Sequence, residues 1–419
     1  MHCVTDLEDR KTRGESPYSP PQFTLQPRAY FATFVAQKSM KKKNLKGMTL
    51  AQLREFARSL GEQPYRATQL FTWIYQKNAS SFDEMSDISR EFRSALTTSA
   101  ALKTLEIKSR QVSPSDGTLK ILFELSDGKK IESVLIPPDS LAAEIDRRLT
   151  LCVSTQVGCP LDCAFCATGT MGFSRNLTTG EIVDQVLQAQ KLSPRRITNI
   201  VFMGMGEPML NYDNVMTAVD LFTDEKSLNI GKRHITISTA GYPEKIRQMA
   251  DEGQSVKLAV SLHSLDNEKR TSLMPLNKKY PLRVLVEALE YYWRKTRRKP
   301  TLEYILFDEF NDSESDVEKL VALSRRIPCK VNIIPFHSIA STQPTGFAAN
   351  LRPANSTKIQ EFAQKLRSEK LTVMVRRSAG QDIDAACGQL AFKQTTSRRI
   401  SGTGKRQSKH TKRIPENVS

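Results

Sequence analysis

Three cysteines close together in the chain have the spacing of a metal-cluster ligand set. Cys159, Cys163 and Cys166 form a Cys-x3-Cys-x2-Cys pattern. Thiolates ligate iron–sulfur clusters, and three of them on a four-iron cluster leave one iron open to an external molecule. Structural zinc is the alternative, but such zinc sites are closed by four ligands, commonly from paired Cys-x2-Cys motifs. Because the chain has no second Cys-x2-Cys pair, the spacing predicts one 4Fe-4S cluster.

Polar and small residues also follow several strand-like runs of the sequence. The carboxyl ends of parallel strands meet at one end of an α/β barrel, where active sites lie. Any one of these endings could be a plain strand-to-helix turn or hold a structural histidine, but together they predict one convergent site. The endings are Gly204–Pro208, Ser238–Gly241, Ser261–His263 and Pro335–His337.

The elements that would position these residues alternate between strand and helix patterns from residue 150 onward. Six repeats in about 185 residues predict a parallel sheet in a partial (β/α)6 barrel, rather than a full eight-stranded one. The predicted strands are Leu151–Thr155, Asn199–Met203, His234–Ser238, Leu258–Leu262, Leu302–Phe307 and Val331–Pro335. The predicted helices are Glu181–Gln190, Asn214–Phe222, Glu244–Asp251, Leu282–Trp293 and Val317–Arg326, followed by a last helix, Lys358–Lys370, and an apolar run, Leu371–Val375.

Helices and then a hairpin are predicted before the barrel. Residues 48–101 have helical periodicity, and Thr49-x-x-Gln52 has the pattern of a capping box, so we expect a small helical domain. Within residues 102–149, the alternating runs Leu119–Leu125 and Lys130–Ile136 flank Asp127-Gly128, which predicts a β-hairpin in a linker region. The barrel, with a catalytic C-terminal segment, then occupies residues 150–392.

One carboxylate lies on an apolar face of the predicted hairpin. Glu132 shares a strand face with Val134 and Ile136. Such a carboxylate is either an edge residue that reaches solvent or a functional base whose pKa is raised by burial. Taken alone, the pattern favours the edge residue.

The charge of the chain indicates a polyanionic partner. Sixty-two Lys and Arg against forty-five Asp and Glu give a net charge of +17, and a basic surface attracts nucleic acid because each phosphate contact releases counterions. A basic tail at 393–419 contributes to this charge, and we expect it to be disordered, like the extension at 1–47. Basic runs at 41–43 and 294–299 lie outside the tail. RNA or DNA binding is therefore predicted, with residues 48–101 as an accessory binding domain.

Cysteine use and hydropathy set the expected compartment. Four of the seven cysteines fall within residues 152–166, which favours a metal or redox centre over a disulfide scaffold. The longest apolar runs are far shorter than the ~20 residues of a membrane span. The first residues show no signal-peptide pattern. We expect a cytoplasmic protein without membrane association.

The cysteine triad, with Phe165 before its last cysteine, resembles the signature of the radical S-adenosylmethionine (SAM) superfamily. Gly206-Glu207-Pro208 is similar to the motif with which that superfamily holds the SAM amino group. The resemblance narrows to the RlmN/Cfr family of RNA-adenine methyltransferases over about residues 48–392. It is carried by Gln156–Cys159, Arg175–Leu177, Met203–Pro208, Ser261–His263 and, above all, Asp382–Leu390.

This resemblance implies a mechanism with a protein-bound methyl group. A cysteine matching Cys387 is methylated by one SAM, and a second SAM yields the 5′-deoxyadenosyl radical that activates the methyl group for transfer to adenine. A cysteine matching Cys152 then releases the adduct through a transient disulfide. The glutamate matching Glu132 is the proton acceptor, which reverses the interpretation from pattern alone. Cys3 and Cys329 have no such support and are interpreted as structural or incidental.

The resemblance also implies the cofactor contacts and partners. The ligands of SAM would be Gly206, Glu207, Ser238, Ser261, Leu262, His263 and His337, the last standing where the family usually has asparagine. A histidine can still offer one donor or acceptor there. The implied partners are 23S ribosomal RNA, some transfer RNAs and a one-electron reductant such as flavodoxin, with the protein acting as a monomer.

Two alternatives remain open at this point. The antibiotic-resistance branch of the same family methylates C8 of the adenine, and its motifs overlap with those found here. A non-catalytic RNA-binding protein stabilised by zinc would also combine clustered cysteines with a basic surface.

Overall fold

The computed structural model describes residues 42–138 and 148–391. Residues 1–41 of the predicted extension, which include Cys3, lie outside the described residues, as do the predicted tail and residues 139–147. Residues 42–47 were also predicted to be disordered, but Lys43 and Asn44 form a strand and Lys46 is buried, so the extension is shorter than predicted. Within the described ranges, no helix is both long and apolar enough to cross a membrane.

The predicted helical domain is present and begins at the predicted cap. The Thr49 side chain accepts a hydrogen bond from the Gln52 amide, and the Gln52 side chain accepts one from the Thr49 amide, which is the reciprocal pattern of a capping box. A short parallel pair, β1 with β2, joins the two ends of the domain. Its elements are β1 (Lys43–Asn44), α1 (Leu50–Ser59), α2 (Pro64–Phe71), a π-helical turn (Thr72–Gln76), α3 (Arg90–Ser99) and β2 (Ala100–Ala101).

A buried ion pair ties this domain to the barrel. Lys46 Nζ lies 2.6 Å from Asp184 Oδ1 on α5 (Thr179–Lys191), and both side chains are almost inaccessible to solvent. The second oxygen of Asp184 accepts hydrogen bonds from the Thr104 hydroxyl and the Leu105 amide. Buried charges are tolerated when they are paired and fully hydrogen-bonded, so this pair fixes the domain at one place on α5.

Ten strands form one continuous sheet, and seven of them are parallel. The parallel order is β14-β13-β12-β11-β10-β9-β6, and β5, β4 and β3 continue the sheet in antiparallel fashion. The strands are β3 (Leu105–Val112), β4 (Leu119–Leu125), β5 (Lys130–Ile136), β6 (Thr150–Cys152), β9 (Asn199–Phe202), β10 (Ile235–Thr239), β11 (Lys257–Ser261), β12 (Thr301–Leu306), β13 (Lys330–Pro335) and β14 (Thr372–Val375).

This architecture confirms the predicted partial barrel with its helical accessory domain. The hairpin expected as a linker is an integral part of the sheet, because β5 pairs with β6 and places Val134 opposite Cys152. β3 was not predicted, since its residues are mostly exposed and lack the alternation of a half-buried strand. The run Leu371–Val375 contains a seventh parallel strand, β14, beside β13.

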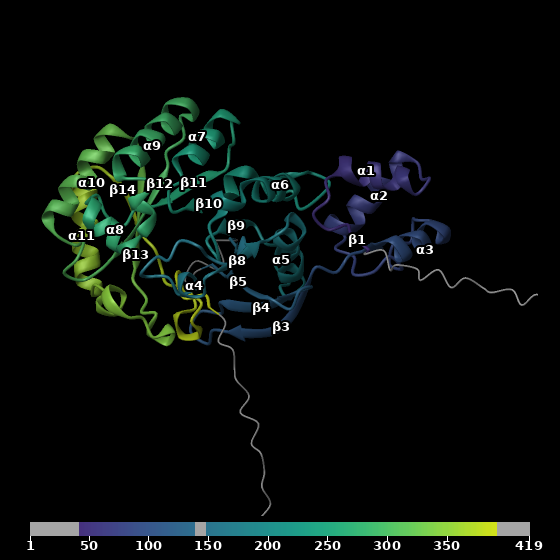
Figure 1. Ribbon diagram of the computed structural model, residues 1–419, viewed down its shortest axis with the longest axis horizontal. Helices are drawn as coiled ribbons and strands as arrows, with labels where there is room; N and C mark the ends of the chain where they lie inside the picture. The colour runs from purple at the N-terminus through teal and green to yellow at the C-terminus, as the bar shows by residue number, and fades with distance from the viewer. Residues whose placement is uncertain (1–41, 139–147, 392–419) are drawn as a thin grey trace, which may run out of the picture. The chain divides into compact units, whose positions relative to one another are not determined.

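Helices cover the outer face of the parallel strands, as Figure 1 shows for α7, α9, α10 and α11. This arrangement follows from the sequence, because β-branched strands buried on both faces need helices packed against them. The helices are α6 (Tyr212–Thr223), α7 (Pro243–Asp251), α8 (Asn267–Leu273), α9 (Leu282–Thr296), α10 (Glu314–Arg326) and α11 (Ser356–Ser368). Single 3-10 turns are Pro208–Asn211, Lys232–His234, Pro275–Lys278, Ala340–Thr342, Gly346–Asn350 and Gln381–Ile383.

Candidate functional site

The three cysteines lie in a loop enclosed by a small hairpin. Strand β7 (Gln156–Gly158) pairs with β8 (Phe173–Asn176), and the short helix α4 (Ala167–Thr170) lies between them. The hairpin was not predicted, because each of its strands has only three or four residues. Gly158 has a φ of +73°, and a Cβ there would lie 1.8 Å from the Gly172 carbonyl oxygen. Only glycine therefore allows the two strands to approach so closely.

The triad lines one cavity, here called the triad cavity, at the carboxyl ends of the strands. Its empty volume, counted together with the open solvent at its mouth, is about 760 Å³. The predicted residues Gly206, Glu207, Ser238, Ser261 and His263 line it together with the cysteines. Leu262 is fully buried and is not among the lining residues, so its side chain packs in the core.

The donor set of this cavity fits an iron–sulfur cluster. Cys159, Cys163 and Cys166 are free thiols whose charges interact with one another, and burial raises the pKa of all three. A ligating thiol must lose its proton, so metal binding would reverse this effect. No three His, Cys, Asp or Glu side chains within residues 42–138 and 148–391 converge tightly enough to hold a single metal ion. Thiolates on one tetrahedral zinc would lie ~3.8 Å apart, given Zn–S bonds of ~2.3 Å, whereas a cluster spreads its ligands over several irons.

The Gly204–Pro208 turn presents a buried carboxylate to the triad cavity. Gly206 has a φ of +96°, and a Cβ would lie 2.4 Å from the Gln156 side chain, so glycine is required there. Glu207 accepts hydrogen bonds from the Met209 amide at 2.9 Å and the Ala240 amide at 2.8 Å. Burial nevertheless raises the pKa of Glu207 to about 7.

His263 offers an unpartnered donor to the same cavity. Its Nδ1 accepts a hydrogen bond from the Ile305 amide at 3.0 Å, so the proton lies on Nε2. Burial lowers the pKa of His263 to about 3, which keeps the ring neutral. Nε2 is buried without a hydrogen-bond partner. An orphaned donor at this position fits a polar ligand such as SAM, because buried polar groups are otherwise satisfied.

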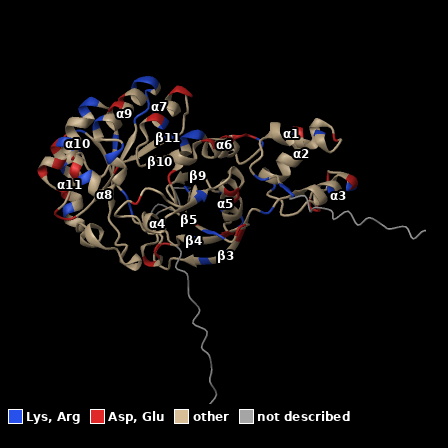
Figure 2. Cartoon of the chain, viewed as in Figure 1, with Lys and Arg blue, Asp and Glu red and all other residues tan. Residues whose placement is uncertain are grey.

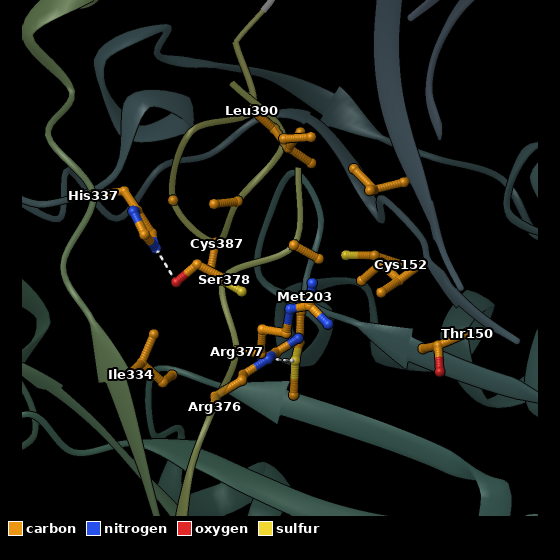
Figure 3. A pocket seen from close by; sticks show the side chains of 16 residues that line it. Thr150, Cys152, Met203, Ile334, His337, Arg376, Arg377, Ser378, Cys387 and Leu390 are labelled. Atoms are coloured by element: carbon orange, nitrogen blue, oxygen red, sulfur yellow. Dashed lines mark hydrogen bonds between the residues drawn. The ribbon is translucent and has the colours of Figure 1, made fainter. Parts of the chain in front are cut away.

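A second cavity, here called the Cys152 cavity, adjoins the first. It is lined by residues of β5, β6 and the segment after β14, and it contains Cys152, Cys387 and His337 (Figure 3). Cys387 also lines the triad cavity, as do Met203, Ile334, Arg376 and Gly388. His337 lines the Cys152 cavity and is not among the residues that line the triad cavity. Its Nε2 lies 2.6 Å from the Ser378 hydroxyl.

Cys387 reaches both cavities because its segment is docked on the cysteine loop. The Ala167 amide donates to the Gly388 carbonyl oxygen at 2.7 Å, and the Thr168 hydroxyl donates to the Leu390 carbonyl oxygen at 2.6 Å. Gly388 has a φ of +83°, and a Cβ there would lie 3.0 Å from the Phe165 carbonyl oxygen. The glycine therefore sets how closely Cys387 approaches the triad.

Cys152 and Cys387 face each other across the Cys152 cavity in Figure 3. Burial raises the pKa of Cys152 to about 12, and the Cys387 side chain adds to this effect. Cys152 is thus a neutral thiol near pH 7. It must give up a proton before it can act as a nucleophile.

Glu132 lies beside this cavity but is not among the residues that line it. It shares a face of β5 with Val134 and Ile136, which do line the cavity, as the alternation predicted. Burial raises the pKa of Glu132, and the ammonium group of Lys120, 3.8 Å away, partly opposes this. Its Oε2 is buried without a hydrogen-bond partner.

Two charged residues of the site escaped the sequence analysis. Arg376 donates to the Met203 sulfur at 3.3 Å and lies 3.9 Å from Glu303, whose other oxygen accepts from Ser238 at 2.8 Å. The nearby Cys387, Glu303 and Cys152 side chains raise the pKa of Arg376. Arg376 directly follows β14, so treating residues 371–375 as a parallel strand would have placed it among the strand ends.

The chain is similar to known proteins over most of its length. Residues 43–102 match the model of the ribosomal RNA large subunit methyltransferase N-terminal domain, and residues 153–321 match that of the radical SAM superfamily. A probable dual-specificity RNA methyltransferase RlmN of Salinibacter ruber is 46% identical, covering 83% of this chain and 94% of the relative. One of Thermotoga maritima is 43% identical, covering 85% and 99%. A crystal structure of a radical SAM methyltransferase from Sphaerobacter thermophilus has a TM-score of 0.75 at 40% identity, covering 83% of this chain and 99% of that one.

Replacing Gly388 by alanine should slow RNA methylation and leave the cluster in place. A left-handed alanine costs roughly 1–2 kcal/mol, and the added Cβ would push the Cys387 segment away from Phe165. If this free-energy cost is added to the activation barrier of methylation, the rate should drop by about tenfold. The iron and sulfide content should not change. Gly346→Ala is the matched control, because Gly346 has a φ of +59° and open space around its Cβ position. A wild-type rate for Gly388→Ala, or loss of iron, would contradict the assignment.

The stability of the cluster-free protein should depend on pH through Glu207. Its folded-state pKa is about 7, against 4.5 for an ordinary glutamate, so folding disfavours the charged form. Relative to Glu207→Gln, the wild type should lose stability as pH rises from about 4.5 to 7, by about 3 kcal/mol in all. Thermal melts of both proteins from pH 5 to 8 measure this difference. If the melting temperatures of the two proteins change equally with pH, the pKa of Glu207 is not raised by burial and the prediction is wrong.

Proposed function

The chain belongs to the RlmN family of radical SAM RNA methyltransferases, and from this premise we propose that it methylates C2 of an adenine in 23S ribosomal RNA. By the same family likeness, we propose certain transfer RNAs as further substrates. The observation that carries the proposal is the position of Cys387, which lines both the triad cavity and the Cys152 cavity.

The chemistry of the substrate calls for such a carrier. Adenine C2 is not nucleophilic, so it cannot simply attack the methyl group of SAM. When bound, the cluster and SAM supply a one-electron cleavage that yields a 5′-deoxyadenosyl radical. Cys387 first takes a methyl group from one SAM, and a second SAM is used to activate that methyl group. A thiol that reaches the cofactor side and the substrate side suits both steps.

The residues around Cys387 have separate tasks in this scheme. Cys152 faces Cys387 and, as a thiolate, attacks its sulfur. The S–S bond forms as the bond between the Cys387 sulfur and the transferred carbon breaks, and that carbon takes up a proton to become the methyl group on adenine. Burial raises the pKa of Glu132, which makes its carboxylate a stronger base and suits it to accept a proton. Arg376 places a fixed positive charge beside both cysteines, and this charge partly opposes the burial that raises the pKa of Cys152.

The triad and Glu207 hold the cofactors in this proposal. The cysteines ligate the cluster, and Glu207 and the Nε2 proton of His263 would bind polar groups of SAM. Gly206, Ser238 and Ser261 line the same cavity, whereas Leu262 can contribute only backbone atoms. A one-electron reductant such as flavodoxin is required to start the cleavage.

Peptide mass spectrometry of the purified protein tests the proposal directly. Cys387 should carry a methyl group in cluster-loaded enzyme exposed to SAM, and this group should be absent from a Cys159→Ala variant that cannot hold the cluster. Cys329→Ala is the control, because Cys329 is buried and lies in neither cavity. An unmodified Cys387 in active, cluster-loaded enzyme would refute the carrier role.

The regiochemistry needs a separate readout. The nucleosides of RNA treated with the enzyme should contain 2-methyladenosine. An 8-methyladenosine product would assign the chain to the antibiotic-resistance branch instead. A colourless protein that holds zinc, without iron or sulfide, after anaerobic purification would support the non-catalytic alternative.

A further inference from the structure

A hollow lined by basic residues lies at the end of the parallel sheet away from the cysteines. Its residues come from the segments that lead into β9, β10, β11 and β12. Because these strands are parallel, their starts lie together, and their carboxyl ends hold the triad cavity. The charged residues that line this basic hollow are Arg196, Lys232, Arg233, His234 and Arg298.

Among the residues that the structure describes, no carboxylate pairs with the cations that line the basic hollow. None of Arg196, Lys232, Arg233 and Arg298 forms an ion pair with a carboxylate within the described ranges. Arg196 donates to the carbonyl oxygens of Leu228 and Asn229. Arg298 donates to the Ser255 carbonyl oxygen, and Arg233 Nε donates to His234 Nε2. None of these partners is an anion, so the positive charge of the hollow is available to an external anion.

Two further lysines extend this charge across the sheet end. Lys257 and Lys330 are exposed at the first positions of β11 and β13. The pKa of Lys257 is lowered by burial and by the charges of Lys330 and Arg148. The pKa of His234 is lowered by burial and by Arg233 and Lys257. Burial is the larger cause in both cases, and the smaller contribution of the neighbouring cations reflects the like charges gathered there.

A simpler explanation for cations at this end of the sheet is that they stabilise helix dipoles, because the outer helices have their carboxyl termini here. That effect is confined to the last turn of a helix. The last turns of α5 and α9 already contain Lys191, Arg294 and Lys295. Lys232, Arg233 and Lys257 lie before or at the start of strands, so helix dipoles do not explain them.

One residue that lines the basic hollow is a neighbour, in the sheet, of one that lines the cavity in which the target base would lie. Thr198 lines the hollow and Thr150 lines the Cys152 cavity. Thr150 pairs with Asn199, and the Leu149 amide donates to the Thr198 hydroxyl at 3.0 Å. The start of the β6–β9 ladder therefore connects the walls of the two regions. Thr150 is about 7 Å from Cys152 along the strand.

We propose that the basic hollow binds the phosphodiester backbone of the substrate RNA a few nucleotides from the target adenine. This inference rests on the proposed function for the identity of the RNA. A nucleic-acid strand has a phosphate every few ångströms, about 3.4 Å of rise in duplex DNA, so an RNA whose base enters the Cys152 cavity has phosphates within reach of Lys257 and Arg233 a few nucleotides away. These contacts read no sequence; they hold the substrate in register.

The test compares two variants with equal loss of charge. The first combines Lys232→Gln, Arg233→Gln and Lys257→Gln in the basic hollow. The control combines Arg283→Gln, Arg325→Gln and Lys365→Gln, whose side chains pair with Glu287, Glu369 and Glu314. Figure 2 shows basic and acidic residues intermixed over the outer helices α10 and α11, where two of the control residues lie. Fluorescence anisotropy with a labelled 23S rRNA stem-loop gives Kd from 50 to 300 mM salt.

The hollow variant should bind this RNA on the order of tenfold more weakly at 0.1 M salt. The slope of log K against log salt should be less steep by about 2, which is ~0.7 for each of the lost phosphate contacts. The control should bind as the wild type does, and both variants should keep the melting temperature and the methyl group on Cys387. Wild-type binding by the hollow variant, or an equal loss in the control, would overturn the proposal.

Two further outcomes are informative. Calorimetric binding of inorganic phosphate that is lost in the hollow variant, with unchanged RNA binding, would assign a small-anion site and also overturn the proposal. A wild-type protein that binds the stem-loop but forms no methyladenine would count against the proposed function. In that case the difference in salt slope between the two variants still decides whether the hollow holds RNA.

Discussion

The site depends on one contact, the docking of the Cys387 segment on the cysteine loop. Two hydrogen bonds, from Ala167 to Gly388 and from Thr168 to Leu390, join residues that are more than 200 positions apart. Without them, the triad would be a cluster site and Cys387 an unrelated thiol. With them, one thiol belongs to two cavities, and the chemistry on one side of it can be passed to the other.

The antiparallel strands support this contact from the opposite side. The Asp116 carboxylate accepts from the Gly380 amide at 2.9 Å, and Ser113 donates to Asp382 at 2.8 Å. Asp116 and Ser113 lie in the turn between β3 and β4. This turn therefore holds the start of the Cys387 segment, and the end of the same segment contacts the cysteine loop. Pairing of β5 with β6 brings Cys152 to the other wall. The sheet therefore fixes the two cysteines independently of the bound cofactors.

Local patterns were sufficient to predict much of this fold. The capping box at Thr49, the hairpin at Asp127-Gly128 and the alternation of strands and helices each depend on neighbouring residues. What escaped prediction depends on distant partners. Strands β7 and β8 are too short to show a period. The role of Arg376 follows from β14, which is a strand only because β13 lies beside it. Likewise, pattern alone places Glu132 on the correct face but cannot show that Lys120 and the segment near Asp384 lie close to it.

The central claim is that Cys387 passes a methyl-derived carbon to adenine and that Cys152 ends this covalent stage. Mass spectrometry of a Cys152→Ala variant, incubated with SAM, reductant and the RNA stem-loop, tests it most directly. The account predicts that the peptide containing Cys387 is recovered with adenosine attached through one carbon, because no second thiol is present to release it. A Cys152→Ala variant that turns over at the wild-type rate and carries no nucleotide would contradict the account.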